Sequence, residues 1–343
     1  MVFQMYMRTF LRSFSVVCLL VTVAVAQVSA EEAPMLKIGI IGLDTSHSPA
    51  FAKGFNAVPA DPEMQNCRVV AAYPYGSKTI ESSSSRIPGY TKQFEEMGIE
   101  IVDSVADLIS KVDCVLLETN DGQVHLEQAE QVIKAGKPLF IDKPVAADLP
   151  DVLTIFALAK EHDVPMFSSS SLRYIDGAQA VRNGDAGKVL SCDTYSPCKT
   201  EPSHSDLYWY GIHGVEALYT CMGTGCETVT RTSTDDFDMV VGKWDEGRIG
   251  TFRGLRAGKN GYGGTAFTSE KIVPIGSYQG YRPLLVEIAK FFRTGESPVP
   301  EAETIELYAF MKAAEESKRQ GGKPVAIATV MKQAKEAAAA AKK

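Results

Sequence analysis

The sequence predicts an α/β chain in which a doubly wound parallel sheet is followed by an α+β domain with a largely antiparallel sheet. Short apolar runs alternate with amphipathic stretches from Leu36 to Ser168, and this alternation is typical of parallel strands joined by helices. After Ser171 helix-like segments precede several strand-like runs, which are joined by turns such as Asp245–Gly247. We therefore expect a first domain over residues 31–170 and a second over residues 171–343, preceded by a separate segment over residues 1–30.

The expected strands of the first domain are short apolar runs, and the stretches between them have helical periodicity. The strands are expected at residues 36–41, 68–73, 100–102, 114–118, 139–142 and 164–168. The helices are expected at residues 48–56, 105–110, 124–135 and 151–162. Residues 75–90, which include four consecutive serines at 82–85, are expected to form a long mobile loop.

In the second domain helices and strands are expected in separate groups. The helices are expected at residues 178–183, 208–220, 281–293 and 303–319, and the strands at residues 228–232, 239–244, 249–253 and 271–275. The tail after Thr329 is rich in Ala and Lys. We expect it to form a helix with a weak packing face, which frays.

Residues 1–30 have the pattern of a secretory signal. Arg8 and Arg12 form a basic start, residues 16–26 are almost wholly apolar, and small residues at 28 and 30 precede Glu31. A transmembrane anchor is the alternative, but the apolar run is shorter than the roughly 20 residues that a span needs. We expect Sec-type export, cleavage after Ala30, and a mature chain that is periplasmic or extracellular without a membrane span.

The charge balance excludes nucleic acid as a partner. Residues 1–30 carry two Arg and no acid, so the remaining chain has 33 basic and 42 acidic residues and a net charge of −9, whereas phosphate binding needs a basic face. Six of the seven cysteines lie beyond residue 30, and an even number in an exported chain indicates disulfides. Cys192 with Cys198, and Cys221 with Cys226, are the locally plausible pairs. No Cys or His spacing indicates zinc, and we expect no metal.

The turn after the first strand carries an altered dinucleotide fingerprint. Gly42 fits the first glycine of Gly-x-Gly-x-x-Gly, but Asp44 stands at the second position and His47 at the third. The second glycine lets the backbone approach the pyrophosphate, and the third lets helix and strand pack closely. At ~4 Å and an effective dielectric constant of 20, the charge of Asp44 would cost about 4 kcal/mol per phosphate charge. Asp44 and His47 could instead form a polar site of their own at the helix start.

The end of the second strand lacks the acid that would hold the ribose. Ser77 and Lys78 stand there, and they could accept a 2′-phosphate, which favours NADP over NAD; alternatively this loop hydrogen-bonds only to itself.

Lys143 ends the fifth expected strand, where parallel sheets bind their ligands. Pro144 forces Lys143 out of the helical region and so directs its side chain. A lysine in this place could polarise a hydroxyl or carbonyl oxygen, or transfer a proton. The alternative is an ordinary surface lysine before a turn.

The stretches at residues 112–125 and 136–146 resemble the core of the glucose–fructose oxidoreductase / inositol dehydrogenase (Gfo/Idh/MocA) family. Members carry Glu-Lys-Pro where this chain has Asp142, Lys143 and Pro144, and Thr-Pro-x-x-x-His just upstream, where this chain has Thr119 and Asn120. His125 comes one residue later than in that pattern. The likeness continues through residues 171–174, 211–216 and the helical end.

The resemblance implies a Rossmann-type first domain that holds NAD(P) and a catalytic Lys143. The cofactor-binding residues that we expect from the fingerprint and from this resemblance are Gly42, Asp44, Thr45, Ser77, Thr119, Asn120, His125 and Asp142. Because the fingerprint is altered and free nicotinamide cofactors are scarce outside the cytoplasm, the cofactor is expected to be NADP, tightly bound, or absent.

The resemblance also implies site residues in the second domain. His213 stands where members have a catalytic acid/base, although Trp209 replaces a leading Asp of that pattern; a core histidine is the alternative. Arg173 is expected at the substrate cleft, with a surface salt bridge as the alternative. Trp209 and Tyr210 could stack on a sugar ring, or pack in the core.

Three functions follow from these residues. The first is an exported NAD(P)-dependent oxidoreductase acting on a sugar or polyol, with Lys143 and His213 as catalytic residues. The second is a glycosidase or lyase in the same cleft, with a tightly held cofactor or none. The third is a carbohydrate-binding protein, since fold alone does not choose among them. We expect a homo-oligomer formed through the sheet of the second domain.

Overall fold

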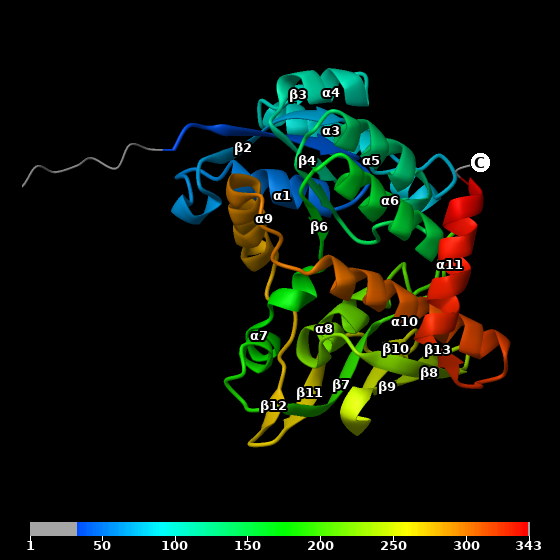
Figure 1. The fold of residues 1–343 in the computed structure, drawn as a ribbon. Coiled ribbons are helices and arrows are strands. Elements are labelled where there is room, and N and C mark those ends of the chain that lie inside the picture. Colours follow the sequence, from blue (N-terminus) through cyan, green and yellow to red (C-terminus); the bar gives the residue numbers. More distant parts are fainter. Residues whose placement is uncertain (1–32, 342–343) are drawn as a thin grey trace, which may run out of the picture. The chain divides into compact units, whose positions relative to one another are not determined.

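Six parallel strands form the first sheet, in the order β3-β2-β1-β4-β5-β6 (Figure 1). The computed structural model describes residues 33–341, so the expected signal segment and its cleavage point lie outside the described residues. The strands are β1 (Leu36–Ile41), β2 (Cys67–Tyr73), β3 (Glu100–Ile101), β4 (Cys114–Leu117), β5 (Leu139–Ile141) and β6 (Met166–Ser168). The strand order reverses between β1 and β4, and ligands of such sheets bind at the carboxyl ends of the strands beside this point.

Helices cover both faces of this sheet (Figure 1). They are α1 (His47–Phe55), α2 (Glu81–Ser84), α3 (Ile87–Glu96), α4 (Val105–Lys111), α5 (His125–Lys134) and α6 (Leu149–Glu161). Short 3-10 turns are η1 (Pro62–Met64), η2 (Gly122–Val124), η3 (Ser171–Tyr174) and η4 (Asp245–Gly247). The predicted doubly wound parallel sheet is confirmed, with every expected strand within two residues of its predicted start.

The second sheet has seven strands, in the order β12-β11-β7-β10-β9-β8-β13. They are β7 (Val189–Pro197), β8 (Cys226–Ser233), β9 (Phe237–Trp244), β10 (Ile249–Leu255), β11 (Gly263–Thr268), β12 (Ile272–Pro274) and β13 (Val325–Ala326). Only β7 and β10 pair in parallel; the other neighbours are antiparallel. The predicted α+β class is therefore confirmed, although β7, β11 and the two-residue β13 were not predicted.

Helices of the second half pack on both sheets. They are α7 (Asp176–Arg182), α8 (Ile212–Met222), α9 (Arg282–Thr294), α10 (Glu301–Arg319) and α11 (Ile327–Ala341). Helix α8 is buried along its whole length, between the second sheet and α10 (Figure 1). Helix α9 instead returns to the first sheet, where Leu284, Leu285 and Ile288 pack in the same core cluster as Phe51 of α1. Residues 33–343 accordingly group as a single unit.

Two predictions of local structure were wrong. Residues 75–90 are not one long loop, because they contain α2 and the start of α3. The serines at 82–84 lie inside α2, and Ser83 is buried. The tail does have a packing face: Ile327, Val330 and Ala334 of α11 are buried, and α11 packs against α6 and α10.

The predicted disulfides were also wrong, since all six described cysteines are free and buried. Cys192 lies within β7 and Cys198 just beyond its end. Six residues of strand span about 20 Å, whereas bridged cysteines need Cα atoms within about 7 Å. The thiol of Cys192 instead contacts that of Cys221 on α8, which together with burial raises the pKa of Cys192.

Within residues 33–341, no helix is both long enough and apolar enough to cross a bilayer.

Candidate functional site

A cavity of about 350 Å³ lies beside the carboxyl ends of the first sheet and is closed from the other side by residues of the second half. The first half contributes Thr45, Ser46, His47, Ser82, Arg86, Asn120 and Lys143 to its lining. The second half contributes Ser171, Leu172, Lys199, Trp209, Tyr210, His213, Tyr262, Tyr278 and Tyr281. Lys143 and His213, the two predicted catalytic residues, therefore line the same cavity.

Lys143 follows β5 directly and enters the cavity from the sheet edge, next to Asp142. Its ammonium lies 3.6 Å from Oδ2 of Asp142. Both residues are buried, Lys143 with 8% of its surface exposed. Lys143 is thus not the surface lysine of the alternative interpretation, and its charge is directed at the space above the strand ends.

Three side chains of types that can ligate a metal ion lie close together beside Lys143. They are His47 at the start of α1, Glu118 after β4, and Asp142 after β5. Nδ1 of His47 lies 2.8 Å from Oδ2 of Asp142, and one donor atom of each residue lies within 4.8 Å of the others. Burial opposes ionisation of Asp142, but His47 and Lys143 outweigh it and hold the pKa of Asp142 below its usual range. Burial, and then the charge of Asp142, raise the pKa of Glu118 well above its usual range.

His213 lies in the first turn of α8 and is buried. Its Nδ1 lies 2.7 Å from the hydroxyl of Ser170, which leaves Nε2 as the ring nitrogen without a hydrogen bond among the described residues. Burial first, and then the positive charges of Lys143 and His47, lower the pKa of His213 well below its ordinary value. His213 is therefore a neutral imidazole at pH 7, able to accept a proton.

The fingerprint turn is folded around Asp44 rather than around a phosphate. Gly42 has a φ of 99°, and a Cβ there would meet the backbone nitrogen of Thr119 at 2.3 Å, so this glycine is required. Asp44 is fully buried, and its two carboxylate oxygens accept hydrogen bonds from the backbone N–H groups of Ser77 (3.1 Å) and Asn120 (3.0 Å). Burial outweighs these bonds and raises the pKa of Asp44 to about 6.

The side chains around this turn close over the edge where a dinucleotide would approach. The hydroxyl of Ser77 donates to Asp121 at 2.7 Å, so it is not available to a 2′-phosphate. The amide of Asn120 donates to the hydroxyl of Ser83 on α2 at 2.9 Å. Since the carboxylate of Asp44 fills the place between Ser77 and Asn120, the residues present do not fit a dinucleotide bound in the usual manner.

Two predicted cofactor residues lie in the core beneath the cavity. Thr119 is buried and does not line the cavity. The ring nitrogens of His125 lie 2.5 Å from the carbonyl oxygen of Thr119 and 3.2 Å from that of Val145. His125 therefore connects the loop after β4 with the loop after β5, which also carries Lys143.

The prediction that Arg173 lies at the substrate cleft is wrong. Its guanidinium is buried, with Nε 2.5 Å from Glu216 and Nη1 2.6 Å from Glu303 of α10. Glu303 also pairs with Arg182. The two acids that hold Arg173 away from the cavity lie 43 and 130 residues further along the chain, so no local pattern indicates them.

Sequence reasoning missed much of the cavity wall. Trp209 and Tyr210, for which stacking on a sugar ring was predicted, line it, and so do Tyr262, Tyr278 and Tyr281. Arg86 and Lys199 add two positive charges that form no ion pair among the described residues, while no Asp or Glu lines the cavity. An aromatic and cationic wall of this kind suits a small polar ligand that carries a negative charge.

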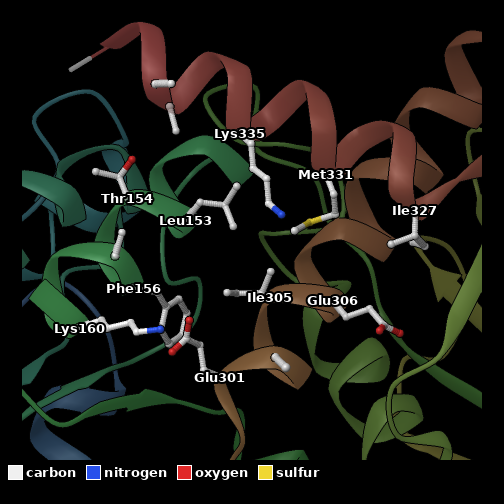
Figure 2. Close-up of a pocket in the computed structure, with 14 residues that line it drawn as sticks. Leu153, Thr154, Phe156, Lys160, Glu301, Ile305, Glu306, Ile327, Met331 and Lys335 are labelled. Atoms are coloured by element: carbon white, nitrogen blue, oxygen red, sulfur yellow. The ribbon is translucent and has the colours of Figure 1, made fainter. Parts of the chain in front are cut away.

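A larger cavity, of about 860 Å³, lies between α6, α10 and α11 (Figure 2). Leu153, Ile305 and Met331 face one another across it (Figure 2). It shares no lining residue with the smaller cavity and holds none of the predicted site residues. We therefore take the smaller cavity as the candidate active site.

The chain thus combines a Rossmann-type sheet with a second, mostly antiparallel sheet, and Lys143 and His213 line one cavity. Residues 36–169 match the family model GFO_IDH_MocA, described as an oxidoreductase family with an NAD-binding Rossmann fold. This part of the chain therefore matches the Gfo/Idh/MocA family, the family whose resemblance the sequence predicted.

Curated relatives match over shorter stretches. An uncharacterized oxidoreductase of Streptococcus pneumoniae is 28% identical over 156 residues, which is 40% of this chain and 42% of the relative. The myo-inositol dehydrogenase Hyg17 of Streptomyces leeuwenhoekii is 32% identical over 73 residues, which is 21% of this chain and 22% of the relative. The matches thus span less than half the length of these relatives.

Solved structures share the whole fold at low sequence identity. A putative NADPH-dependent oxidoreductase from Desulfitobacterium hafniense has a TM-score of 0.70 at 15% identity, over 86% of this chain and 99% of that one. The scyllo-inositol dehydrogenase of Lactobacillus casei, solved with NAD(H) and scyllo-inositol, has a TM-score of 0.68 at 14% identity, over 86% and 99% of the two chains. These likenesses show that the fold extends over both sheets.

Proposed function

We propose that this protein is an enzyme that acts on a CH–OH group of a small sugar or polyol. The observation that carries the proposal is that Lys143 and His213 line one cavity from opposite halves of the chain. A cavity of about 350 Å³ lies within the range of about 300–1,000 Å³ in which proteins bind small molecules. The tyrosines and Trp209 offer flat apolar faces for a sugar ring.

The two catalytic residues take different parts. The ammonium of Lys143 donates a hydrogen bond to the reacting oxygen and stabilises negative charge that develops on it. Neutral His213 accepts the hydroxyl proton at Nε2, while Ser170 holds the ring through Nδ1. The imidazolium that forms is buried and lies near the positive charge of Lys143. Both effects destabilise it, so His213 releases the proton readily.

A negatively charged substrate, such as a sugar acid, fits the cavity better than a neutral one. Arg86, Lys143 and Lys199 line it and no carboxylate does, although the protein as a whole has a net charge of −7. Opposite charge in a cleft raises the local concentration of a ligand and its association rate.

A nicotinamide cofactor supplies the hydride acceptor in this family. In this chain the carboxylate of Asp44 accepts the hydrogen bonds of the Ser77 and Asn120 amides. His47 stands at the third glycine position of the dinucleotide fingerprint. We therefore expect free NAD(P) to bind weakly. These two residues favour a second candidate, a non-redox enzyme such as a glycosidase or lyase that uses the same lysine and histidine. A carbohydrate-binding protein is the third possibility.

Two measurements test the proposal. Mass spectrometry under non-denaturing conditions detects a retained dinucleotide directly. A panel of sugars, polyols and their acids, assayed for product with and without added NAD(P), then tests turnover by wild type and Lys143→Met. Turnover that depends on Lys143 and on the dinucleotide supports the oxidoreductase, and turnover without it supports the second candidate. Binding of a panel member without turnover by wild type would contradict catalysis.

We further propose that the chain is exported and assembles with a second copy. Export rests on the basic start, apolar run and small residues before Glu31, and N-terminal sequencing of protein from its host tests cleavage after Ala30. Assembly rests on Tyr195, Phe237 and Ile249, large exposed apolar residues on strands of the second sheet. Light scattering of wild type and Phe237→Asp tests it, because a dimer through this face should dissociate in the variant.

A further inference from the structure

Glu118 is the least satisfied polar side chain at the candidate site. It follows β4, is fully buried, and neither of its carboxylate oxygens has a hydrogen-bond partner within residues 33–341. A buried polar group without a partner costs about 1–3 kcal/mol, and a charged one more. Proteins seldom keep such a group unless something else occupies the site with it.

The surroundings of Glu118 are those of a cation site. His47 and Asp142 approach it from two other strand ends, and a donor atom of each of the three residues lies within 4.8 Å of the others. Two ligands of one ion lie at most about 4.4 Å apart, since metal–oxygen and metal–nitrogen distances are ~2.0–2.2 Å. Three ligands of one ion at these distances lie no more than roughly 3.8 Å from one another, so side-chain shifts of less than about 1 Å bring all three donors onto one ion.

We propose that His47, Glu118 and Asp142 bind one divalent transition-metal ion, Zn²⁺ or Mn²⁺, at the floor of the cavity. An imidazole nitrogen with two carboxylate oxygens suits these ions, whereas Mg²⁺ and Ca²⁺ prefer oxygen ligands alone. The two carboxylates balance the charge of the ion, and Lys143, with its ammonium 3.6 Å from Asp142, remains beside the site as a separate cation.

Three protein ligands leave coordination positions open, as in catalytic rather than structural sites. His47 lines the cavity, so the open positions face the space between Lys143 and His213. A hydroxyl or carboxylate oxygen of a substrate would reach the ion there, and the ion would orient it.

The site also gives a reason for the altered fingerprint. The third fingerprint glycine allows close packing of helix and strand, but at this position the chain has His47, which reaches to Asp142. The same substitution that removes the dinucleotide motif thus supplies a metal ligand. This inference concerns binding and does not rest on the proposed reaction.

The test is metal binding by the purified full chain after removal of metals with a chelator. Calorimetric titration with ZnCl₂ and with MnCl₂ should show one ion per chain for at least one of the two metals, and elemental analysis should confirm that stoichiometry after dialysis. Glu118→Gln keeps the shape of the side chain and removes a ligand, so its affinity should fall by about 100-fold or more, at least the loss seen for outer-shell partners. The metal affinity of His47→Gln should fall to a similar extent.

Matched controls separate this site from exposed residues. Glu161→Gln and His162→Gln change the same residue types at exposed positions and should bind as wild type does. The metal should raise the melting temperature of wild type and of both controls, and not that of Glu118→Gln. The proposal is overturned if wild type binds neither ion with this stoichiometry, or if the folded Glu118→Gln and His47→Gln variants bind as tightly as wild type.

Discussion

Nδ1 of His47 lies 2.8 Å from Oδ2 of Asp142, and this contact joins the altered fingerprint to the residue that precedes Lys143. His47 stands at the start of α1, while Asp142 precedes Lys143 after β5. Because the carboxyl ends of β1 and β5 meet at one edge of the sheet, two substitutions that lie 95 residues apart in the chain form a single contact. The change from glycine to histidine therefore acts on the lysine site and not only on the phosphate site.

Lys143→Met should abolish turnover of a substrate found in the panel, by about 10²–10⁴-fold or more in kcat. Methionine keeps the apolar stem and removes the donor to the reacting oxygen. Steady-state kinetics measure the loss, and Lys53→Met, on α1 outside the cavity, is the control. Because Lys143 is buried beside Asp142, its removal should also lower stability somewhat, so circular dichroism must confirm the fold. Turnover at the wild-type rate would exclude Lys143 from catalysis.

His213→Asn should lower kcat by about 10²–10⁴-fold and change KM much less, because it removes a proton acceptor and keeps the size of the side chain. The pH profile gives an independent test. Burial holds the pKa of His213 well below 6.5, so wild-type kcat/KM should stay level through pH 6.5 and decline only at lower pH, when the imidazole becomes protonated. That decline should be absent in the variant; an equal loss of kcat at every pH would argue for a structural role.

Asp44 should make the protein less stable as the pH rises from about 4 to about 6. Its pKa is raised from 3.8 to about 6 in the folded chain, so in this interval the folded state holds a proton that the unfolded state has lost. This contribution to the unfolding free energy is complete below about pH 4 and absent above about pH 6. The unfolding free energy should therefore fall by up to about 3 kcal/mol over this interval.

Urea unfolding of wild type and Asp44→Asn at several pH values measures this contribution. The difference between the two in unfolding free energy should change over that interval, because the variant cannot titrate at this position. Asp103→Asn changes an exposed residue, so its unfolding free energy should change with pH in the same way as that of wild type. A constant difference between wild type and Asp44→Asn would show that Asp44 is ionised throughout.

The sequence was sufficient for the strands of the first sheet and for the two cavity residues Lys143 and His213. Strand ends are read from short apolar runs, and Lys143 follows such a run and precedes Pro144. His213 was predicted only from the resemblance to the Gfo/Idh/MocA family, because without that resemblance a core histidine was the alternative. The sequence was not sufficient for contacts that depend on distant residues. Arg173 lies next to a strand end like Lys143, but its buried partners Glu216 and Glu303 come from elsewhere in the chain. No local pattern distinguishes a buried, ion-paired arginine such as Arg173 from a lysine that faces the cavity such as Lys143.

Glu118 is a second residue whose neighbours could not be predicted from local sequence. It follows an apolar strand, and no local pattern places its carboxylate beside His47 and Asp142. The strands β7 and β11 were missed because glycines and polar residues interrupt their alternation, while their pairing is determined by neighbours in the sheet.

Arg173→Leu should destabilise the protein by about 3–5 kcal/mol, because it leaves Glu216 and Glu303 as buried acids that have lost a partner. Urea unfolding measures this loss. Arg182→Leu, which removes the half-buried partner of Glu303, should cost about 1 kcal/mol or less. If Arg173 instead bound substrate, the variant would raise KM and leave the unfolding free energy unchanged.

Asp44→Gly alone should not restore tight binding of NAD(P). The carboxylate of Asp44 points into the protein, toward the amides of Ser77 and Asn120, so its removal frees those amides but leaves His47 at the third glycine position. Asp44→Gly combined with His47→Gly removes both obstacles and should bind dinucleotide at least about tenfold more tightly than either single variant, a gain of about 1.4 kcal/mol. Calorimetric titration with NAD and with NADP measures the four proteins, and circular dichroism checks their folds. A large gain in Asp44→Gly alone would mean that charge repulsion is the main obstacle, whereas no gain in the folded double variant would mean that the Asn120–Ser83 contact keeps the groove closed.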